Sequence, residues 1–109
     1  MRIYIAGKIT NDPNYKRKFA DAEMRLLENN AIEVINPAKV LSNLPESFTH
    51  EEYMAISFKL IDSSDAVVFL KDWFESPGAN QEMGYAIAKE KTIIEYMGRS
   101  GEMFFNADI

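Results

Sequence analysis

The sequence has 109 residues, of which 47% are hydrophobic and 27% are charged, so we expect one ordinary globular domain spanning residues 1–109. It contains no cysteine and a single histidine, which excludes disulfides, thiolate nucleophiles and cysteine-ligated zinc. We therefore expect no metal and no cofactor, and any hydrolytic chemistry has to use carboxylates, hydroxyls and backbone amides.

The charge balance disfavours a polyanionic partner. Twelve basic and seventeen acidic residues give a net charge of −5, and the one basic run, Lys16–Lys18, lies in a predicted helix. For that run we favour a solvated face over a contact with a nucleic acid polymer. No apolar run approaches the ~20 residues of a membrane helix and no export signal is visible, so we expect a cytoplasmic protein without membrane contact.

The first elements are a strand and a helix. Arg2–Ala6 is short, β-branched and aromatic, and it runs into Gly7, which is typical of a first strand entering a turn. Asp12-Pro13 supplies an N-cap and a proline at the first helical position. Apolar residues then recur at helical spacing to about Asn29, which predicts an amphipathic helix.

The middle of the chain predicts a strand, a long loop and a second helix. Ile32–Ile35 reads as the strand, and the irregular stretch Asn36–His50 is long enough to be a lid or substrate loop. Thr49 and Glu52 form a capping-box pattern that begins the helix, and Asp62–Asp65 ends it.

The last part predicts a central strand followed by a helix and a final strand. Ala66–Leu70 is apolar on both faces, as expected in the middle of a parallel sheet covered on both sides. Ala79–Lys89 has helical spacing, and Thr92–Tyr96 is the expected last strand. The alternation predicts an open α/β fold, a Rossmann-like or flavodoxin-like three-layer sandwich with a parallel sheet of four to five strands.

Ligands of such sheets bind beyond the carboxyl ends of the strands, which directs attention to the turn at Gly7. There a glycine lets the backbone approach a ligand, and Lys8 and Thr10 can contact an anion. A tight turn without a ligand is the alternative, and on local pattern alone we favour it.

The turn after the central strand leads from Ser76 into a helix expected to start near Gly78. The free amides of Gly78 and Ala79, with the Ser76 hydroxyl, form a potential phosphate site. Glu82 is then expected in the first helical turn, where the helix dipole keeps it ionised as a covalent nucleophile requires. The alternative, favoured on local pattern alone, is that Glu82 only stabilises the helix start and Ser76 only caps it.

The two motifs together resemble the nucleoside 2-deoxyribosyltransferase superfamily, and within it the smaller 2′-deoxynucleoside 5′-monophosphate N-glycosidases. The resemblance covers nearly the whole chain, from Ile3-Tyr4-Ile5-Ala6-Gly7-Lys8-Ile9 to Ser76-x-Gly78-x-x-x-Glu82-x-Gly84-x-Ala86. It implies that Glu82 attacks the anomeric carbon of deoxyribose and expels the base.

The resemblance also implies roles for the other matching residues. Tyr4 matches the tyrosine that orients the carboxylate, with core packing as the alternative, and Gly7 and Ile9 match turn positions that contact substrate. Relatives that act on free nucleosides carry an acid six residues before the catalytic glutamate, where this chain has Ser76. Because a serine accommodates a phosphate that a carboxylate repels, we favour a 5′-monophosphate, with Lys8 as a second phosphate contact.

One position departs from the family. Its catalytic aspartate is expected eight residues before Asp65, where this chain has Ser57. Asp72, just after the central strand, is the candidate replacement because it should face the same crevice, and a surface aspartate in a turn is the equal alternative. Without an acid the enzyme loses roughly 10²–10⁴ in rate, which makes altered substrate choice or binding alone open alternatives.

Three further residues have a functional and a structural interpretation. Trp73, like Phe74 beside it, either stacks on a base or packs at a subunit interface. Asn36 either hydrogen-bonds the base or opens a turn. We expect His50 to be a surface residue at a helix start rather than a catalyst.

The C-terminal tail suggests a partner subunit. Gly98–Gly101 and Met103–Phe105 leave little room for another helix, and the exposed aromatic pair favours burial against a second chain. The resemblance implies a homo-oligomer, a dimer or larger, in which a neighbour completes each site. Arg99, Ser100 and Asn106 are the candidates for that contribution.

The sequence therefore predicts hydrolysis, or base exchange, at the N-glycosidic bond of a 2′-deoxynucleoside 5′-monophosphate through Glu82. A nucleotide-binding or sequestering protein with little turnover is the alternative, motivated by Ser57. A structural oligomerisation module without a ligand is a third, which no sequence feature supports.

Overall fold

The computed structural model describes residues 1–29, 33–96 and 104–106. Its described strands form one sheet in the order β2-β1-β3-β4-β5, in which the first four are parallel and β5 runs antiparallel to β4. The elements are β1 (Arg2–Ala6), α1 (Tyr15–Glu28), β2 (Glu33–Ile35), α2 (Pro37–Leu41), α3 (His50–Asp62), β3 (Ala66–Phe69), the 3₁₀ helix η1 (Trp73–Glu75), α4 (Pro77–Ala88), β4 (Thr92–Tyr96) and β5 (Phe104–Asn106).

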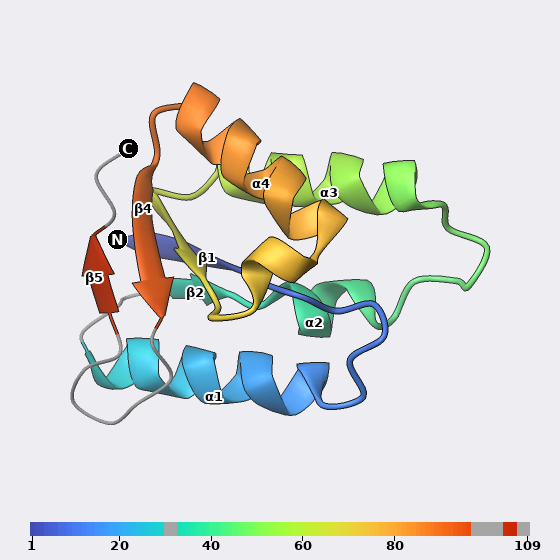
Figure 1. The fold of residues 1–109 in the computed structure, drawn as a ribbon, viewed down its shortest axis with the longest axis horizontal. Coiled ribbons are helices and arrows are strands. Elements are labelled where there is room, and N and C mark those ends of the chain that lie inside the picture. The colour runs from blue at the N-terminus through green and yellow to red at the C-terminus, as the bar shows by residue number, and fades with distance from the viewer. Residues whose placement is uncertain (30–32, 97–103, 107–109) are drawn as a thin grey trace.

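Helices cover both faces of the sheet, which confirms the predicted three-layer α/β sandwich. In Figure 1, α1 lies on one side of the strands and α3 and α4 lie on the other. Alternate residues of β1 enter two separate cores: Ile3 and Ile5 pack with α1, whereas Tyr4 packs with α3 and α4. This period-two alternation is what a strand buried on both faces requires.

The predicted centre of the sheet is confirmed. Every residue of β3 is buried, and β3 lies between β1 and β4. Its register with β1 pairs Ala6 with Phe69, so the residues that follow the two strands, Gly7 and Leu70, lie at the same edge of the sheet. This is the edge at which α/β proteins bind ligands.

The predicted start of the first helix is wrong by two residues. Helix α1 begins at Tyr15, not at Pro13, and Asn14 is the residue before it. Asp12 does not cap the helix, because its carboxylate accepts hydrogen bonds from the backbone N–H of Asn14 (2.9 Å) and from Lys18 (2.6 Å). Lys18 is accordingly half-buried, not part of a fully solvated basic face.

The stretch predicted to be irregular contains a short helix. Asn36 caps α2, because its side-chain oxygen accepts the N–H of Ala38 at 3.0 Å, and Pro37 occupies the first helical position. The same Asn-Pro pair that predicts a turn is a helix-start signal when apolar residues follow.

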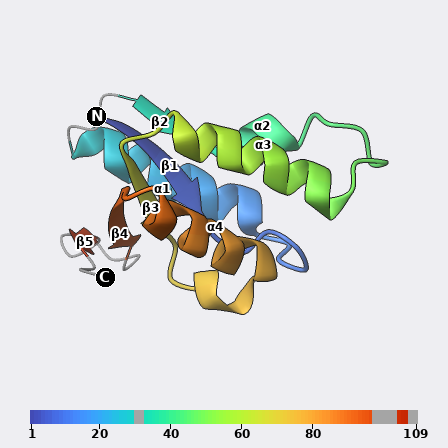
Figure 2. The same cartoon turned by 90° about the horizontal axis from the view of Figure 1, so that it is seen from above.

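Helices α3 and α4 lie beside each other over one face of the sheet (Figure 2). The Phe58 and Tyr85 rings stack between them with centroids 4.3 Å apart. The predicted capping box at the start of α3 is confirmed, since the side chains of Thr49 and Glu52 each accept a hydrogen bond from the backbone N–H of the other residue.

The prediction that β4 is the last strand is wrong, because β5 pairs with it at the edge of the sheet. Gly98–Gly101 and Met103, and with them Arg99 and Ser100, lie outside the described residues, as does Ile32 at the predicted start of β2. The predicted burial of Phe104 and Phe105 against a second chain stays a prediction.

Candidate functional site

A cavity of about 880 Å³ opens at the carboxyl ends of β1 and β2. Its wall is built from the loop after β1, from α2, from the first turns of α3 and from the N-terminal half of α4. Nine of the sequence-predicted site residues line it: Tyr4, Gly7, Lys8, Ile9, Thr10, Ser76, Gly78, Ala79 and Glu82. The volume is in the range that proteins use for small-molecule ligands.

Glu82 is the buried acid of this cavity. Its residue is 6% exposed, and the Tyr4 hydroxyl donates a hydrogen bond to its Oε2 atom from the neighbouring strand β1. The expected position in the first turn of α4 is wrong, because the helix starts at Pro77 and Glu82 is its sixth residue. The side chain therefore lies beyond the first turn, where the helix dipole acts most strongly.

Burial has the largest effect on the pKa of Glu82. Loss of water raises the pKa of its carboxyl from 4.5 to about 7, although hydrogen bonds from Tyr4 and Ser57 oppose the shift. The expectation that the helix keeps Glu82 ionised is thus wrong: near pH 7 both protonation states are populated. The pKa of Tyr4 is raised well above its usual value by burial and by the Glu82 charge, so Tyr4 stays a hydrogen-bond donor.

The position that the family resemblance assigns to an aspartate lies beside Glu82. Ser57 is 3% exposed and lines the cavity, and its hydroxyl lowers the pKa of both Glu82 and Tyr4. A serine there supplies a hydrogen bond but no proton that titrates near neutral pH.

One face of α3 was missed as a cavity wall. His50, Tyr53, Met54 and Ser57 all line the cavity, although we expected His50 to be a surface residue at the helix start. It does begin the helix and is exposed, yet it also faces the site. The 0, 3, 4, 7 spacing of these residues is that of a single helix face, which is the signal that identifies them.

The N-terminus of α4 has the predicted form. Ser76 caps the helix, since its Oγ accepts the N–H of Ala79 at 3.1 Å, and Pro77 follows at the first position. The hydroxyl proton of Ser76 remains available to a ligand, because the cap uses only an oxygen lone pair. Gly78 and Ala79 both line the cavity, but only the Gly78 amide is free, because the cap already uses the Ala79 amide that we expected to be free.

Gly7 combines a packing role with a place in the cavity wall. A Cβ atom there would lie 2.9 Å from Leu70 Cδ1 and 3.1 Å from Leu70 Cβ, so only glycine lets the end of β1 approach the end of β3. Next to it, the Lys8 ammonium lies 3.2 Å from a Glu75 carboxylate oxygen, from the segment directly before Ser76. The predicted phosphate contact thus already has an acidic partner.

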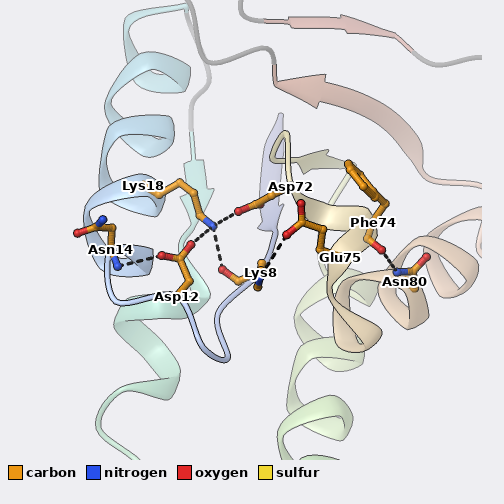
Figure 3. A network of polar contacts seen from close by, with 8 residues as sticks. All are labelled: Lys8, Asp12, Asn14, Lys18, Asp72, Phe74, Glu75 and Asn80. Carbon is orange, nitrogen blue, oxygen red and sulfur yellow. Dashed lines mark hydrogen bonds and ion pairs between the residues drawn. The ribbon is translucent and has the colours of Figure 1, made fainter.

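Asp72 does not face the cavity that holds Glu82, which makes that prediction wrong. Its Oδ2 atom lies 2.5 Å from the Lys18 ammonium, which also donates to the Lys8 carbonyl and to Asp12 (Figure 3). Asp72 lines a second cavity of about 450 Å³ on the α1 side instead. The Lys18 ammonium also holds the pKa of Asp12 below its ordinary value, chiefly through the hydrogen bond between them.

Trp73 and Asn36 also lie away from the wall of the larger cavity. Trp73 packs edge-on against Phe69, with ring centroids 5.5 Å apart. Asn36 is buried, and its amide group is engaged on both sides, by Ala38 as the cap of α2 and by Glu23 at 3.0 Å. Trp73 and Asn36 therefore do not line the site in which we expected them to contact the base.

Within residues 1–29, 33–96 and 104–106, no group of three or more acidic or histidine side chains is arranged to hold a metal ion. No helix in this described part of the chain is long and apolar enough to cross a membrane. The predicted homo-oligomer stays a prediction.

The fold and the cavity define an α/β protein with a ligand-sized site at the carboxyl edge of its parallel strands, centred on a buried glutamate. Residues 1–95 match the family described as a domain of unknown function, DUF4406, and the chain belongs to that family. No curated protein matches the sequence.

Proposed function

We propose that the protein breaks the N-glycosidic bond of a 2′-deoxynucleoside 5′-monophosphate, with Glu82 as the nucleophile. The observation that carries the proposal is the buried Glu82 carboxyl, held by Tyr4 inside a ligand-sized cavity. Buried acids with a raised pKa in a cavity are concentrated at functional sites, because an isolated one destabilises the fold.

Helix α4 carries both the residues proposed to bind the phosphate and the carboxylate proposed to attack the sugar. The amide end of α4 at Gly78 lies one helical turn, about 6 Å, before Glu82, which is the scale of a deoxyribose ring. A phosphate on the Gly78 amide, with the Ser76 hydroxyl, thus brings the anomeric carbon toward Glu82.

The proposed reaction has two steps. A Glu82 oxygen forms a bond to the anomeric carbon while the carbon–nitrogen bond breaks, and the base leaves with that electron pair and takes up a proton. Water then cleaves the resulting ester and restores Glu82, or a second base accepts the sugar instead. Tyr4 holds Oε2 throughout, and attack needs the ionised carboxylate, whose population grows as pH rises through about 7.

A protein that binds the nucleotide without cleaving it is the second candidate. Ser57 favours it, because the position beside Glu82 holds a hydroxyl where the resemblance implies a carboxylic acid. The departing base then has to take its proton from another donor, and this can cost the reaction roughly 10²–10⁴ in rate.

The test is release of free base from each of the four 2′-deoxynucleoside 5′-monophosphates, followed by chromatography. We expect the wild type to release base and Glu82→Gln to lose about a thousandfold or more, because the amide cannot form the ester. Calorimetry on the same samples measures binding, and Glu28→Gln, at the exposed end of α1, is the matched control. Binding without release supports the second candidate, and full activity of Glu82→Gln ends the first.

A further inference from the structure

The space above Gly78 is walled by side chains from two helices. A Cβ atom on Gly78 would lie 3.6 Å from Cε1 of His50, 3.7 Å from Oγ of Ser76 and 3.4 Å from Sδ of Met54. His50, Gly78 and Ser76 all line the cavity. An imidazole and a hydroxyl therefore border the same small opening at the amide end of α4.

The glycine at this opening is not required by the fold itself. Those three distances are ordinary van der Waals contacts, so an alanine fits without displacing a neighbour. Gly78 is helical, and alanine is the better helix former. What an alanine takes away is the space between His50 and Ser76 through which a ligand reaches the Gly78 amide.

His50 is well placed to contact such a ligand. In the part of the chain that the structure describes, its imidazole has no hydrogen bond or ion pair, whereas the Lys8 ammonium is paired with Glu75. A ring N–H is a good donor to a phosphate oxygen.

We propose that His50 is a substrate-binding residue that donates a hydrogen bond to the 5′-phosphate across the space above Gly78. The inference rests on the proposed function and deepens it, because it assigns the charged end of the nucleotide to α3 as well as α4. His50 then contributes to selection of a monophosphate over the free nucleoside, and it does not touch the bond that breaks.

The experiment compares the four 2′-deoxynucleoside 5′-monophosphates with the corresponding 2′-deoxynucleosides, using calorimetric Kd values and, where base is released, KM and kcat. For His50→Ala we expect Kd and KM for the monophosphates to rise about tenfold or more, because a hydrogen bond to a charged group is lost. We expect kcat to stay within about twofold and nucleoside binding to be unchanged. His50→Gln should restore part of the affinity, since its amide donates a hydrogen bond.

Gly78→Ala fills the space directly. We expect it to weaken monophosphate binding at least as much as His50→Ala without lowering Tm. Gly84→Ala is the matched control on the same helix, because no atom lies within 4 Å of its Cβ position and the residue is exposed. It should leave Kd unchanged.

The outcomes separate this inference from the proposed function. The role of His50 is overturned if His50→Ala binds the monophosphates as tightly as the wild type, or if it loses as much affinity for the nucleosides as for the monophosphates. In either case, base release that depends on Glu82 still supports the glycosidase. Tight binding without base release removes the glycosidase, and the Kd comparison still decides on His50. If the folded wild type binds no monophosphate at millimolar concentration, both proposals fall.

Discussion

Two carboxyl groups near the carboxyl edge of the sheet have pKa values shifted in opposite directions. Glu82 lies inside the cavity wall with hydroxyl partners, and burial raises its pKa to about 7. Asp12 lies in the loop before α1 with the Lys18 ammonium 2.6 Å away, which lowers its pKa. The difference shows that burial and partner charge act together: burial raises the pKa of Glu82 against its hydroxyl partners, whereas the ammonium partner of Asp12 lowers its pKa.

The two groups therefore affect stability at opposite ends of the pH range. Glu82 holds its proton more tightly in the folded state, so its contribution is fully present below the unfolded pKa of about 4.5 and is lost as pH rises through about 7. Asp12 holds its proton less tightly when folded, so its contribution is present above the ordinary value of 3.8 and is lost as pH falls through its folded pKa.

The largest effect on stability is expected at Glu82. Glu82→Gln removes the charge that burial opposes, and a pKa shift from 4.5 to about 7 corresponds to about 3 kcal/mol. We expect the free energy of unfolding to rise by about this amount at pH 8.5 and by little at pH 4, as measured by urea denaturation. A gain of equal size at both pH values contradicts this account.

A smaller loss is expected where the two central strands approach each other. Gly7→Ala forces a methyl group against the buried Leu70 side chain at 2.9 Å, and overpacking of this kind costs about 2 kcal/mol. Gly84→Ala, whose Cβ position is open, should instead raise the free energy of unfolding by up to about 1 kcal/mol. If both variants are equally stable, Gly7 is not a packing requirement.

The elements that the sequence predicted best are those with a repeated local signal. The capping box at Thr49, the all-apolar run of β3 and the helix after Ser76 follow from residue types and spacing alone. Helix α2 and strand β5 were missed because they are short, and their few residues carry less periodic signal than the contacts that stabilise them.

The site was predictable along each element but not between elements. Glu82 and Ser76 could be assigned to one edge of the sheet from strand order, whereas Tyr4 was assigned only through the family resemblance. Asp72 and Trp73 follow the same central strand, yet the 3₁₀ turn directs Asp72 toward Lys18 of α1 and packs Trp73 on Phe69. The direction of each side chain depends on partners distant in sequence, so no local sequence pattern predicts it.

The smallest effect is expected at the ion cluster on the α1 side. Lys18→Met leaves Asp12 without its ammonium, so the pKa of Asp12 should rise toward its ordinary value of 3.8, as followed by carboxyl NMR. Tm should fall slightly at pH 7, and the difference from wild type should shrink as pH falls through the wild-type pKa of Asp12. Arg17→Met, at an exposed position beside it, controls for a change in charge alone. A difference that is constant from pH 7 down to about pH 2 means that Lys18 acts through packing of its aliphatic stem and not through Asp12.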